Sequence, residues 1–246
     1  MTTGLPLEVR ALTLRYGAIE AVSGLDFEVR PGEILGFLGP NGAGKTSTLR
    51  ACAGLLRPAA GTVTIAGAPI AEQPLVARAR MGLVPDEPFL YERLSAREFF
   101  DFIGALYDVP AATAAERAER LIERLDLGEV ADRLIESYSL GMRQKVSVVA
   151  ALLHEPALLM LDEPLTGLDP RGARALKDLL RDHATRGGGV LVSTHLLDVA
   201  ERLCDRVVIL SRGHKLAEGS LASLRGTRAD ATLEEVFLHL TGEPPA

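Results

Sequence analysis

The sequence predicts an α/β protein with a mostly parallel sheet covered by helices, an antiparallel β layer and an inserted α-helical subdomain. Three patterns support this fold class. In the last part of the chain, apolar strands alternate with amphipathic helices, which is typical of parallel sheets covered on both faces. The first third shows strands in succession, and the segment from residue 95 to about residue 137 has helical periodicity.

The strands of the first third are short stretches in which apolar and polar residues alternate, as in half-buried strands. They cover residues 7–12, 27–29 and 61–67, and Pro31-Gly32 follows the second. We expect them to form the antiparallel layer beside the core.

The middle of the chain is expected to form the inserted helical subdomain, over about residues 88–145. Two capping boxes, Ser95/Glu98 and Thr113/Glu116, mark expected helix starts. The apolar positions of these helices are Leu121, Ile122, Leu125, Leu134 and Ile135.

The last part of the chain returns to strands and helices in alternation. The expected strands are residues 157–161, 190–193 and 207–210, and the expected helices are residues 171–184 and 196–204. A final amphipathic helix is expected over residues 232–240, opened by a Thr232/Glu235 capping box.

The composition is that of a globular protein, with 47% hydrophobic and 24% charged residues among 246. The sequence has no run of about 18 apolar residues that could span a bilayer, and its first residues do not resemble a secretory signal, so we expect a cytoplasmic protein. Cys52 and Cys204 lie in apolar patterns and are expected to be reduced core cysteines. The net charge of −6, without a block of Lys or Arg, argues against nucleic acid as the main partner.

The most specific motif is Gly39-Pro40-Asn41-Gly42-Ala43-Gly44-Lys45-Thr46, which fits the phosphate-binding pattern of Gly, four residues and Gly-Lys-Ser/Thr. An expected strand, residues 33–38, precedes it, and an expected helix, residues 47–56, follows with Leu49, Leu55 and Leu56 as apolar positions. Glycines allow backbone N–H groups to approach a phosphate, and Lys45 adds a full positive charge. The sequence therefore predicts a P-loop NTPase core that binds a nucleoside triphosphate through residues 39–47, from Gly39 to Ser47.

Two carboxylates follow an apolar strand at residues 158–161, and a P-loop enzyme needs such groups. We expect Asp162 to hold Mg²⁺ together with the hydroxyl of Thr46, and Glu163 to polarise the water that attacks the γ-phosphate. A structural acidic turn at the end of a strand is the alternative.

The stretch Tyr138-Ser139-Leu140-Gly141-Met142-Arg143-Gln144-Lys145 opens a helix just before that strand. Here the sequence resembles the ATP-binding-cassette (ABC) ATPases, whose signature reads Leu-Ser-Gly-Gly-Gln. The chain keeps Ser139 and Gly141 and departs from the signature at Tyr138, Leu140 and Met142. The resemblance implies that residues 139–142 contact an ATP held by the P-loop of another subunit, in a head-to-tail dimer with two ATPs between its halves. A plain serine N-cap is the alternative.

Further motifs follow in the family's order. Residues 166–170 resemble the D-loop, in which Asp169 reaches across the dimer; a plain loop before a helix is the alternative. His195 resembles the switch histidine that contacts the γ-phosphate and the attacking water, with a catalytic role beside Glu163 and Lys45. Tyr16 matches the aromatic residue that stacks on adenine, and a core tyrosine is the alternative.

One departure from the family pattern concerns magnesium. The family usually has glutamine after the strand at residues 81–85, whereas this chain has Asp86 followed by Glu87. A carboxylate is still a ligand for Mg²⁺, but it lacks the amide donor and adds negative charge near the phosphates.

The resemblance implies an ATP-hydrolysing subunit of a membrane exporter, peripheral on the inner face of the membrane, with a permease subunit on a separate chain. Residues 1–220 are then the nucleotide-binding domain and residues 221–246 a helical tail, and the dimer is either a homodimer or a heterodimer. Six aromatic residues that cluster after Asp86 suggest a docking groove for the permease, with packing inside the helical insert as the alternative: Phe89, Tyr91, Phe99, Phe100, Phe102 and Tyr107.

Two other functions are alternatives for this chain. A soluble ABC ATPase that acts on ribosomes or nucleic acid usually has two cassettes or long coiled coils, and this chain has one cassette and no heptad run. A GTP-binding switch is disfavoured because no Asn-Lys-x-Asp guanine-reading sequence is present.

Overall fold

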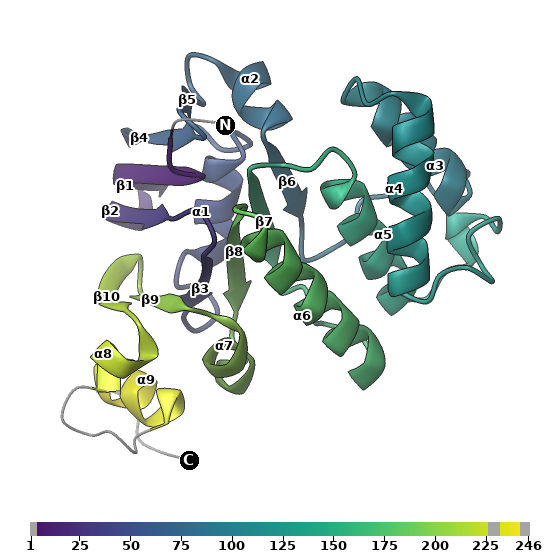
Figure 1. Ribbon diagram of the computed structural model, residues 1–246. Helices are drawn as coiled ribbons and strands as arrows, with labels where there is room; N and C mark the ends of the chain where they lie inside the picture. The colour runs from purple at the N-terminus through teal and green to yellow at the C-terminus, as the bar shows by residue number, and fades with distance from the viewer. Residues whose placement is uncertain (1–3, 226–231, 242–246) are drawn as a thin grey trace.

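The computed structural model describes residues 4–225 and 232–241, and Figure 1 shows its two sheets with helices around them. The larger sheet has the strand order β10-β9-β3-β8-β7-β6. All its neighbouring strands are parallel except β10, which is antiparallel to β9. The prediction of a mostly parallel sheet is confirmed. Its strands are β3 (Ile34–Leu38), β6 (Met81–Val84), β7 (Leu158–Asp162), β8 (Gly189–Thr194), β9 (Arg206–Ser211) and β10 (His214–Gly219).

The centre of this sheet is buried on both faces, so its strands are continuously apolar. All residues of β3 are buried, and successive side chains point to opposite faces. Ile34 and Leu38 pack in a cluster with the helices α3 to α7, whereas Leu35 and Phe37 pack in a second cluster with α1 and the other sheet. The strand that precedes the glycine loop is therefore fixed from both sides.

The second sheet is antiparallel, as predicted, with the strand order β2-β1-β4-β5. Its strands are β1 (Leu7–Tyr16), β2 (Ile19–Val29), β4 (Ala60–Ile65) and β5 (Ala68–Pro69). A two-residue turn joins β1 to β2, and Gly17 has a φ of +60° at its first position. This turn places Tyr16 at the end of its strand.

Helix α1 (Lys45–Cys52) begins directly after the glycine loop but ends earlier than predicted. Gly54 adopts a φ of +69°, and the N–H groups of Gly54 and Leu55 donate to the carbonyls of Ala51 and Arg50. This is a Schellman termination, which a glycine at this position favours. Leu55 lies beyond the end of α1 and is 66% exposed, so the prediction that it is an apolar position of this helix was wrong. A short helix, α2 (Pro74–Ala79), precedes β6.

The middle segment is helical, as predicted, and lies to one side of the parallel sheet (Figure 1). It comprises α3 (Ala96–Leu106), α4 (Ala111–Arg124), a 3₁₀ turn η1 (Ile135–Ser137) and α5 (Leu140–Leu152). The Ser95/Glu98 capping box is confirmed at the start of α3. The box at Thr113/Glu116 was wrong, because α4 starts directly after Pro110, whose fixed φ suits a helix start, and Thr113 lies inside the first turn.

The last helices are α6 (Pro170–Thr185), α7 (Leu197–Leu203), α8 (Leu221–Arg225) and α9 (Leu233–Thr241). Leu233 and Phe237 bury the inner face of α9 in the same cluster as α7. The predicted Thr232/Glu235 capping box is confirmed by two hydrogen bonds of 2.9 and 3.2 Å. The rest of the predicted tail, residues 226–231 and 242–246, lies outside the described residues.

The two cysteines are free and buried, as predicted, and burial raises the pKa of each thiol to about 12. Among the residues that the structure describes, no helix combines the length and the apolar character needed to cross a bilayer.

Candidate functional site

The loop between β3 and α1 curls around the start of the helix, and its glycines determine its shape. Gly42 and Gly44 have φ values of +80° and +103°, a region that favours glycine. At Gly39 the reason is crowding, because a Cβ there would lie 2.5 Å from the carbonyl oxygen of Leu210. The loop thus presents backbone N–H groups beside a helix N-terminus, which is a site for an anion.

Lys45 is the positive charge of this loop, and it is only 6% exposed. Its Nζ donates to the carbonyl oxygen of Gly39 at 2.6 Å and to that of Pro40 at 3.3 Å. Burial lowers the pKa of the ammonium, and the negative charges of Glu163 and Asp162 oppose this effect. Lys45 is therefore held at the floor of the loop with its charge directed toward the carboxylates.

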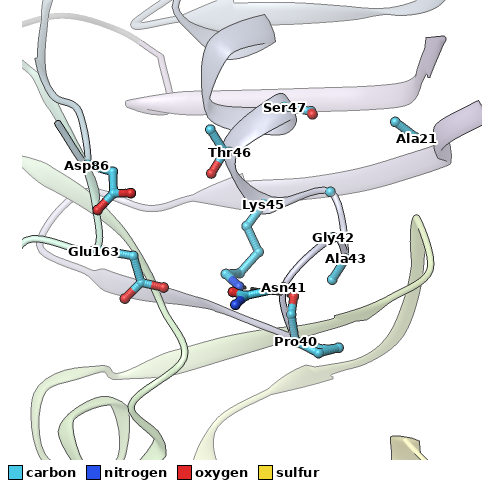
Figure 2. A pocket seen from close by; sticks show the side chains of 11 residues that line it. Ala21, Pro40, Asn41, Gly42, Ala43, Lys45, Thr46, Ser47, Asp86 and Glu163 are labelled. Carbon is cyan, nitrogen blue, oxygen red and sulfur yellow. Dashed lines mark hydrogen bonds between the residues drawn. The ribbon is translucent and has the colours of Figure 1, made fainter. Parts of the chain in front are cut away.

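A cavity of about 200 Å³ opens above this loop, and Figure 2 shows its lining. The loop forms one wall, and Asp86 and Glu163 approach from the other side, facing Thr46 and Lys45 (Figure 2). The complete lining is Ala21, Pro40, Asn41, Gly42, Ala43, Gly44, Lys45, Thr46, Ser47, Asp86 and Glu163. Eight of the nine residues predicted to bind phosphate line this cavity, and the exception is the crowded Gly39.

The carboxylates follow the ends of two strands of the parallel sheet. Asp162 ends β7, is 4% exposed, and accepts a hydrogen bond from the hydroxyl of Ser193 on β8. Glu163 comes next, with a φ of +46° that is unusual for a residue with a side chain. This turn directs its carboxylate into the cavity instead of along the strand.

His195 lies one residue beyond β8 and contacts Glu163 directly. The imidazole Nδ1 is 2.9 Å from Oε1 of Glu163, and the backbone N–H of His195 donates to Oε2 at 3.4 Å. The structure therefore brings together the predicted catalytic residues Lys45, Glu163 and His195.

Asp86 lies in the loop after β6. Partial burial raises the pKa of its carboxyl above the ordinary value, and the neighbouring charges of Asp162, Glu163 and Glu87 raise it further. Four carboxylates, Asp86 included, thus lie close enough to repel one another, a field that a cation would offset.

The donors predicted for Mg²⁺ lie together, since Thr46, Asp86 and Asp162 all line a second cavity of about 430 Å³ next to the first. In the described part of the chain, no three His, Cys, Asp or Glu side chains converge into a complete metal site. This donor set still fits Mg²⁺, because that ion usually takes one or two protein carboxylates and completes its shell with waters and phosphate oxygens.

Tyr16 lies at the rim of the phosphate loop and is 46% exposed, so the alternative of a core tyrosine was wrong. Its hydroxyl is 3.2 Å from the hydroxyl of Ser47, which connects the antiparallel sheet to α1. The ring is available to a ligand that extends beyond the loop.

The residues of the predicted signature lie outside both cavities. Ser139 is the N-cap of α5 and accepts the N–H of Met142 at 3.3 Å, while Leu140 is 52% exposed. Asp169 caps α6 in the same way, through the N–H of Gly172 at 2.8 Å. Within one chain Ser139 and Asp169 act as helix caps, and the contact with ATP predicted for residues 139–142 requires a second subunit.

Five members of the aromatic cluster after Asp86 divide into two groups, and the sixth, Tyr107, stacks on His154 with ring centroids 3.8 Å apart. Phe99 and Phe100 are buried, as expected for packing of the helices against each other. Phe89 is 95% exposed and lies at the edge of a cavity of about 200 Å³ between β6, α3 and α5. Tyr91 and Phe102 are also exposed and meet edge to face, with ring centroids 5.4 Å apart.

Two residues that position the site were missed by the sequence analysis. Ser193 pairs in register with Asp162, and the signal was a hydroxyl residue within an otherwise apolar strand. Gln144 is 2% exposed, and its side-chain amide donates to the carbonyl of Pro164 at 3.4 Å. A polar residue on the buried face of a helix is the signal for Gln144.

Comparisons with known proteins identify the family of the chain. Residues 22–166 match the family model described as ABC transporter. The chain is 39% identical over 225 residues to the daunorubicin resistance ATP-binding protein DrrA3 of Streptomyces coeruleorubidus, covering 90% of this chain and 71% of that protein. It is 38% identical over 231 residues to the Nod factor export ATP-binding protein I of Cupriavidus metallidurans, covering 94% of this chain and 76% of that protein. A solved structure of an ATP binding subunit of an ABC transporter has a TM-score of 0.92 and 35% identity, covering 97% of this chain and 100% of that chain.

Proposed function

The chain belongs to the ATP-binding subunits of ABC transporters, and from this premise we propose that it binds MgATP around Lys45 and hydrolyses it in a head-to-tail dimer that drives export. Members of this family are ATPases that work with membrane permease components. The expectation of a transporter subunit, in preference to a soluble ABC ATPase that acts on ribosomes or nucleic acid, is confirmed.

One observation carries the assignment of the site: the phosphate loop, Lys45 and the carboxylates of Asp86 and Glu163 face each other across one cavity. The loop offers N–H groups and a helix N-terminus to phosphate oxygens, and Lys45 adds a charge that burial keeps from water. The triphosphate of ATP fits this wall, with the γ-phosphate toward Glu163. The exposed ring of Tyr16 then lies where adenine can stack.

Hydrolysis needs a group that takes a proton from the attacking water. Glu163 is the proposed base, because its carboxylate enters the cavity opposite Lys45. His195 holds that carboxylate through its ring and its backbone N–H and is the proposed contact of the γ-phosphate. Ser193 fixes Asp162 in a similar way, through a hydrogen bond to Oδ1.

We assign the oxygen atoms of Thr46, Asp86 and Asp162 as the protein's donors to Mg²⁺, directly or through water. An ion bound there would supply positive charge to the phosphate oxygens. Its charge would also offset the carboxylate repulsion that adds to burial in raising the pKa of Asp86.

The dimer is proposed because the predicted signature lies away from the phosphate loop of its own chain. Ser139 and the N-terminus of α5 form a second anion-binding turn, but they lie outside the cavity of their own chain. A second subunit turned head to tail would bring this turn onto the γ-phosphate, with Asp169 at the same seam. Because Ser139 and Glu163 are both present, a homodimer of this chain contains two complete sites. In a heterodimer this chain supplies the phosphate loop and Glu163 to one site and the signature turn to the other.

The permease is proposed to dock at the cavity beside Phe89, with the ATPase on the inner face of the membrane. A side chain that is 95% exposed at the rim of an apolar hollow suits the anchor residues of a short helix. The export direction follows the relatives, one a drug-resistance protein by name and the other a Nod factor export protein. Residues 1–220, with the helical insert at about 88–145, form the proposed nucleotide-binding domain, and residues 221–246 a helical tail.

Glu163→Gln tests the proposed mechanism. This variant keeps the shape of the site and loses the base, so we expect it to bind MgATP, to hydrolyse little, and to elute as a dimer on size exclusion. Glu87→Gln, which removes a neighbouring carboxylate, is the matched control and should hydrolyse ATP normally. A Glu163→Gln chain that remains monomeric at saturating MgATP contradicts the dimer.

A further inference from the structure

The signature turn at the start of α5 touches the loop that follows Glu163 in the same chain. A Cβ built on Gly167 would lie 3.0 Å from Cδ2 and 3.1 Å from Cγ of Leu140, so the leucine side chain rests directly on this glycine. A Cβ built on Gly141 would lie 2.5 Å from the carbonyl oxygen of Gly167. The two backbones are therefore in contact, and only glycine fits at position 141.

A second contact lies one turn further along α5. Gln144 is 2% exposed, and its amide donates to the carbonyl oxygen of Pro164, the residue next to Glu163. If the Gln144 amide lost this acceptor, a buried donor would be left without a hydrogen bond, which is unfavourable. The contact therefore keeps α5 and Pro164 together. Leu140 and Gln144 thus hold both ends of the 164–167 segment.

The other side of the signature turn is anchored to the helical segment. The hydroxyl of Tyr138 donates to the carbonyl of Val130 at 2.5 Å, and the guanidinium of Arg143 contacts Glu92 and the carbonyls of Glu136 and Tyr138. The turn is therefore fixed between the helical segment and the loop of Glu163, and a movement of one is passed to the other.

We propose that Leu140 and Gln144 are positioning residues that fix the loop at residues 163–168, and with it the carboxylate of Glu163, to the signature turn of the same chain. Leu140 stands where the family signature has glycine, and the side chain supplies the contact with Gly167 that glycine cannot make. This proposal rests on the proposed dimer, in which the signature turn of a chain contacts the ATP of its partner. The contact then lets that turn adjust the position of Glu163, which acts on the ATP held by its own chain. Small displacements of a base are costly, since about 1 Å can reduce a rate on the order of 100-fold.

Mixed dimers of tagged chains separate this role from a direct contact of Leu140 with ATP. One chain carries Glu163→Gln, so only the site with the other chain's Glu163 hydrolyses ATP. We expect Leu140→Ala in the chain with intact Glu163 to lower kcat about tenfold at unchanged KM, and Leu140→Met to restore it. Leu140→Ala in the Glu163→Gln chain, whose signature turn faces the ATP that is hydrolysed, should lower kcat less than the same change in the chain with intact Glu163. The proposal is overturned if kcat falls mainly when Leu140→Ala is in the Glu163→Gln chain, or if it falls equally with the change in either chain.

A second measurement does not depend on the dimer. The N–H groups of Thr166 and Leu168 donate to the carbonyls of Glu163 and Leu165, so their hydrogen exchange reports on the loop. In the monomeric chain we expect Leu140→Ala and Gln144→Leu to raise exchange in residues 164–169 about tenfold. Leu134→Ala, which removes another exposed leucine of the helical segment, should not. Unchanged exchange in both variants overturns the proposal. If exchange rises as expected in both variants but the Glu163→Gln chain does not dimerise, the result counts only against the dimer.

Discussion

Nδ1 of His195 lies 2.9 Å from Oε1 of Glu163, which joins the residues that follow two neighbouring parallel strands, β7 and β8. The backbone N–H of His195 approaches the second carboxylate oxygen at 3.4 Å. The histidine therefore restrains the carboxylate that faces Lys45 across the cavity.

His195→Ala is expected to lower kcat about 100-fold, because the base loses its orientation and the γ-phosphate loses a contact. The affinity for ATP should change little, since the phosphate loop is intact. Phosphate release and binding of a fluorescent ATP analogue measure the two effects. His214→Ala, in the exposed part of β10, is the control, and a His195→Ala kcat within threefold of the parent would exclude a role in hydrolysis.

Tyr16→Ala is expected to weaken ATP binding about tenfold, since base stacking on an aromatic ring contributes about 1–3 kcal/mol. Tyr16→Phe keeps the ring and removes only the hydroxyl near Ser47, so it should bind ATP as the parent does. Isothermal titration with MgATP compares the two. Equal weakening in both variants would assign the effect to the hydroxyl and contradict stacking.

Asp86→Gln is expected to keep or raise the ATPase rate, because the amide removes one of the charges that repel Asp162 and Glu163. The variant should need more Mg²⁺ for half-maximal activity, since one hard donor is weakened. Titration of the ATPase rate with Mg²⁺ measures both effects. A loss of kcat above about tenfold, some 1.4 kcal/mol in the barrier, would instead show a specific need for the carboxylate.

Phe89→Ala is expected to uncouple transport while the isolated chain hydrolyses ATP normally, because the side chain is exposed and outside the nucleotide cavity. Tyr91→Ala should behave alike. Transport is measured in membranes that contain the permease. Leu75→Ala, on α2, removes a similarly exposed apolar side chain as a control. If transport and isolated ATPase activity fall together, the cluster is structural.

The pH dependence of stability is expected to come partly from His183, which is 5% exposed at the end of α6. Burial, aided by Arg186 and His154 and opposed by Glu155, lowers the pKa of this histidine to about 4. The unfolded chain therefore binds the proton more tightly, and the contribution to stability is complete above the unfolded pKa of about 6.5 and lost as the pH falls toward 4. Between pH 7 and pH 5 the loss is about 2 kcal/mol.

Urea unfolding at the two pH values measures this loss. His183→Leu should remove most of the difference, whereas His239→Leu, in α9, should not. An undiminished difference in His183→Leu would assign the pH dependence to other groups.

The parts of the site that the sequence predicted are those encoded by adjacent residues. The glycine loop depends on one contiguous pattern, and its spacing alone placed Gly39, Lys45 and Thr46 in order. The Ser193–Asp162 contact depends on the register of two strands, which neither strand encodes by itself. The contact of Leu140 with Gly167 likewise needs the relative placement of α5 and a distant loop.

Local competition between signals explains the errors in the fold. Thr113 and Glu116 have the spacing of a capping box, but Pro110 starts the helix before them. Leu55 continues an apolar helical pattern, but Gly54 ends the helix. Strand β10 has a partly exposed edge and few apolar residues, so periodicity gave no signal for it.

The position of β3 at the centre of the sheet also determines when the molecule can acquire its structure during synthesis. Residues 34–38 pair with residues 190–194 on one side and with residues 206–209 on the other. At typical translation rates, on the order of 10 s passes between the appearance of β3 and that of its second neighbour. During this interval β3 lacks one or both of its neighbouring strands, although the helix and the antiparallel strands that pack on one of its faces are already present. The strand that leads into the glycine loop therefore gains its last partner only after residue 209 has been synthesised.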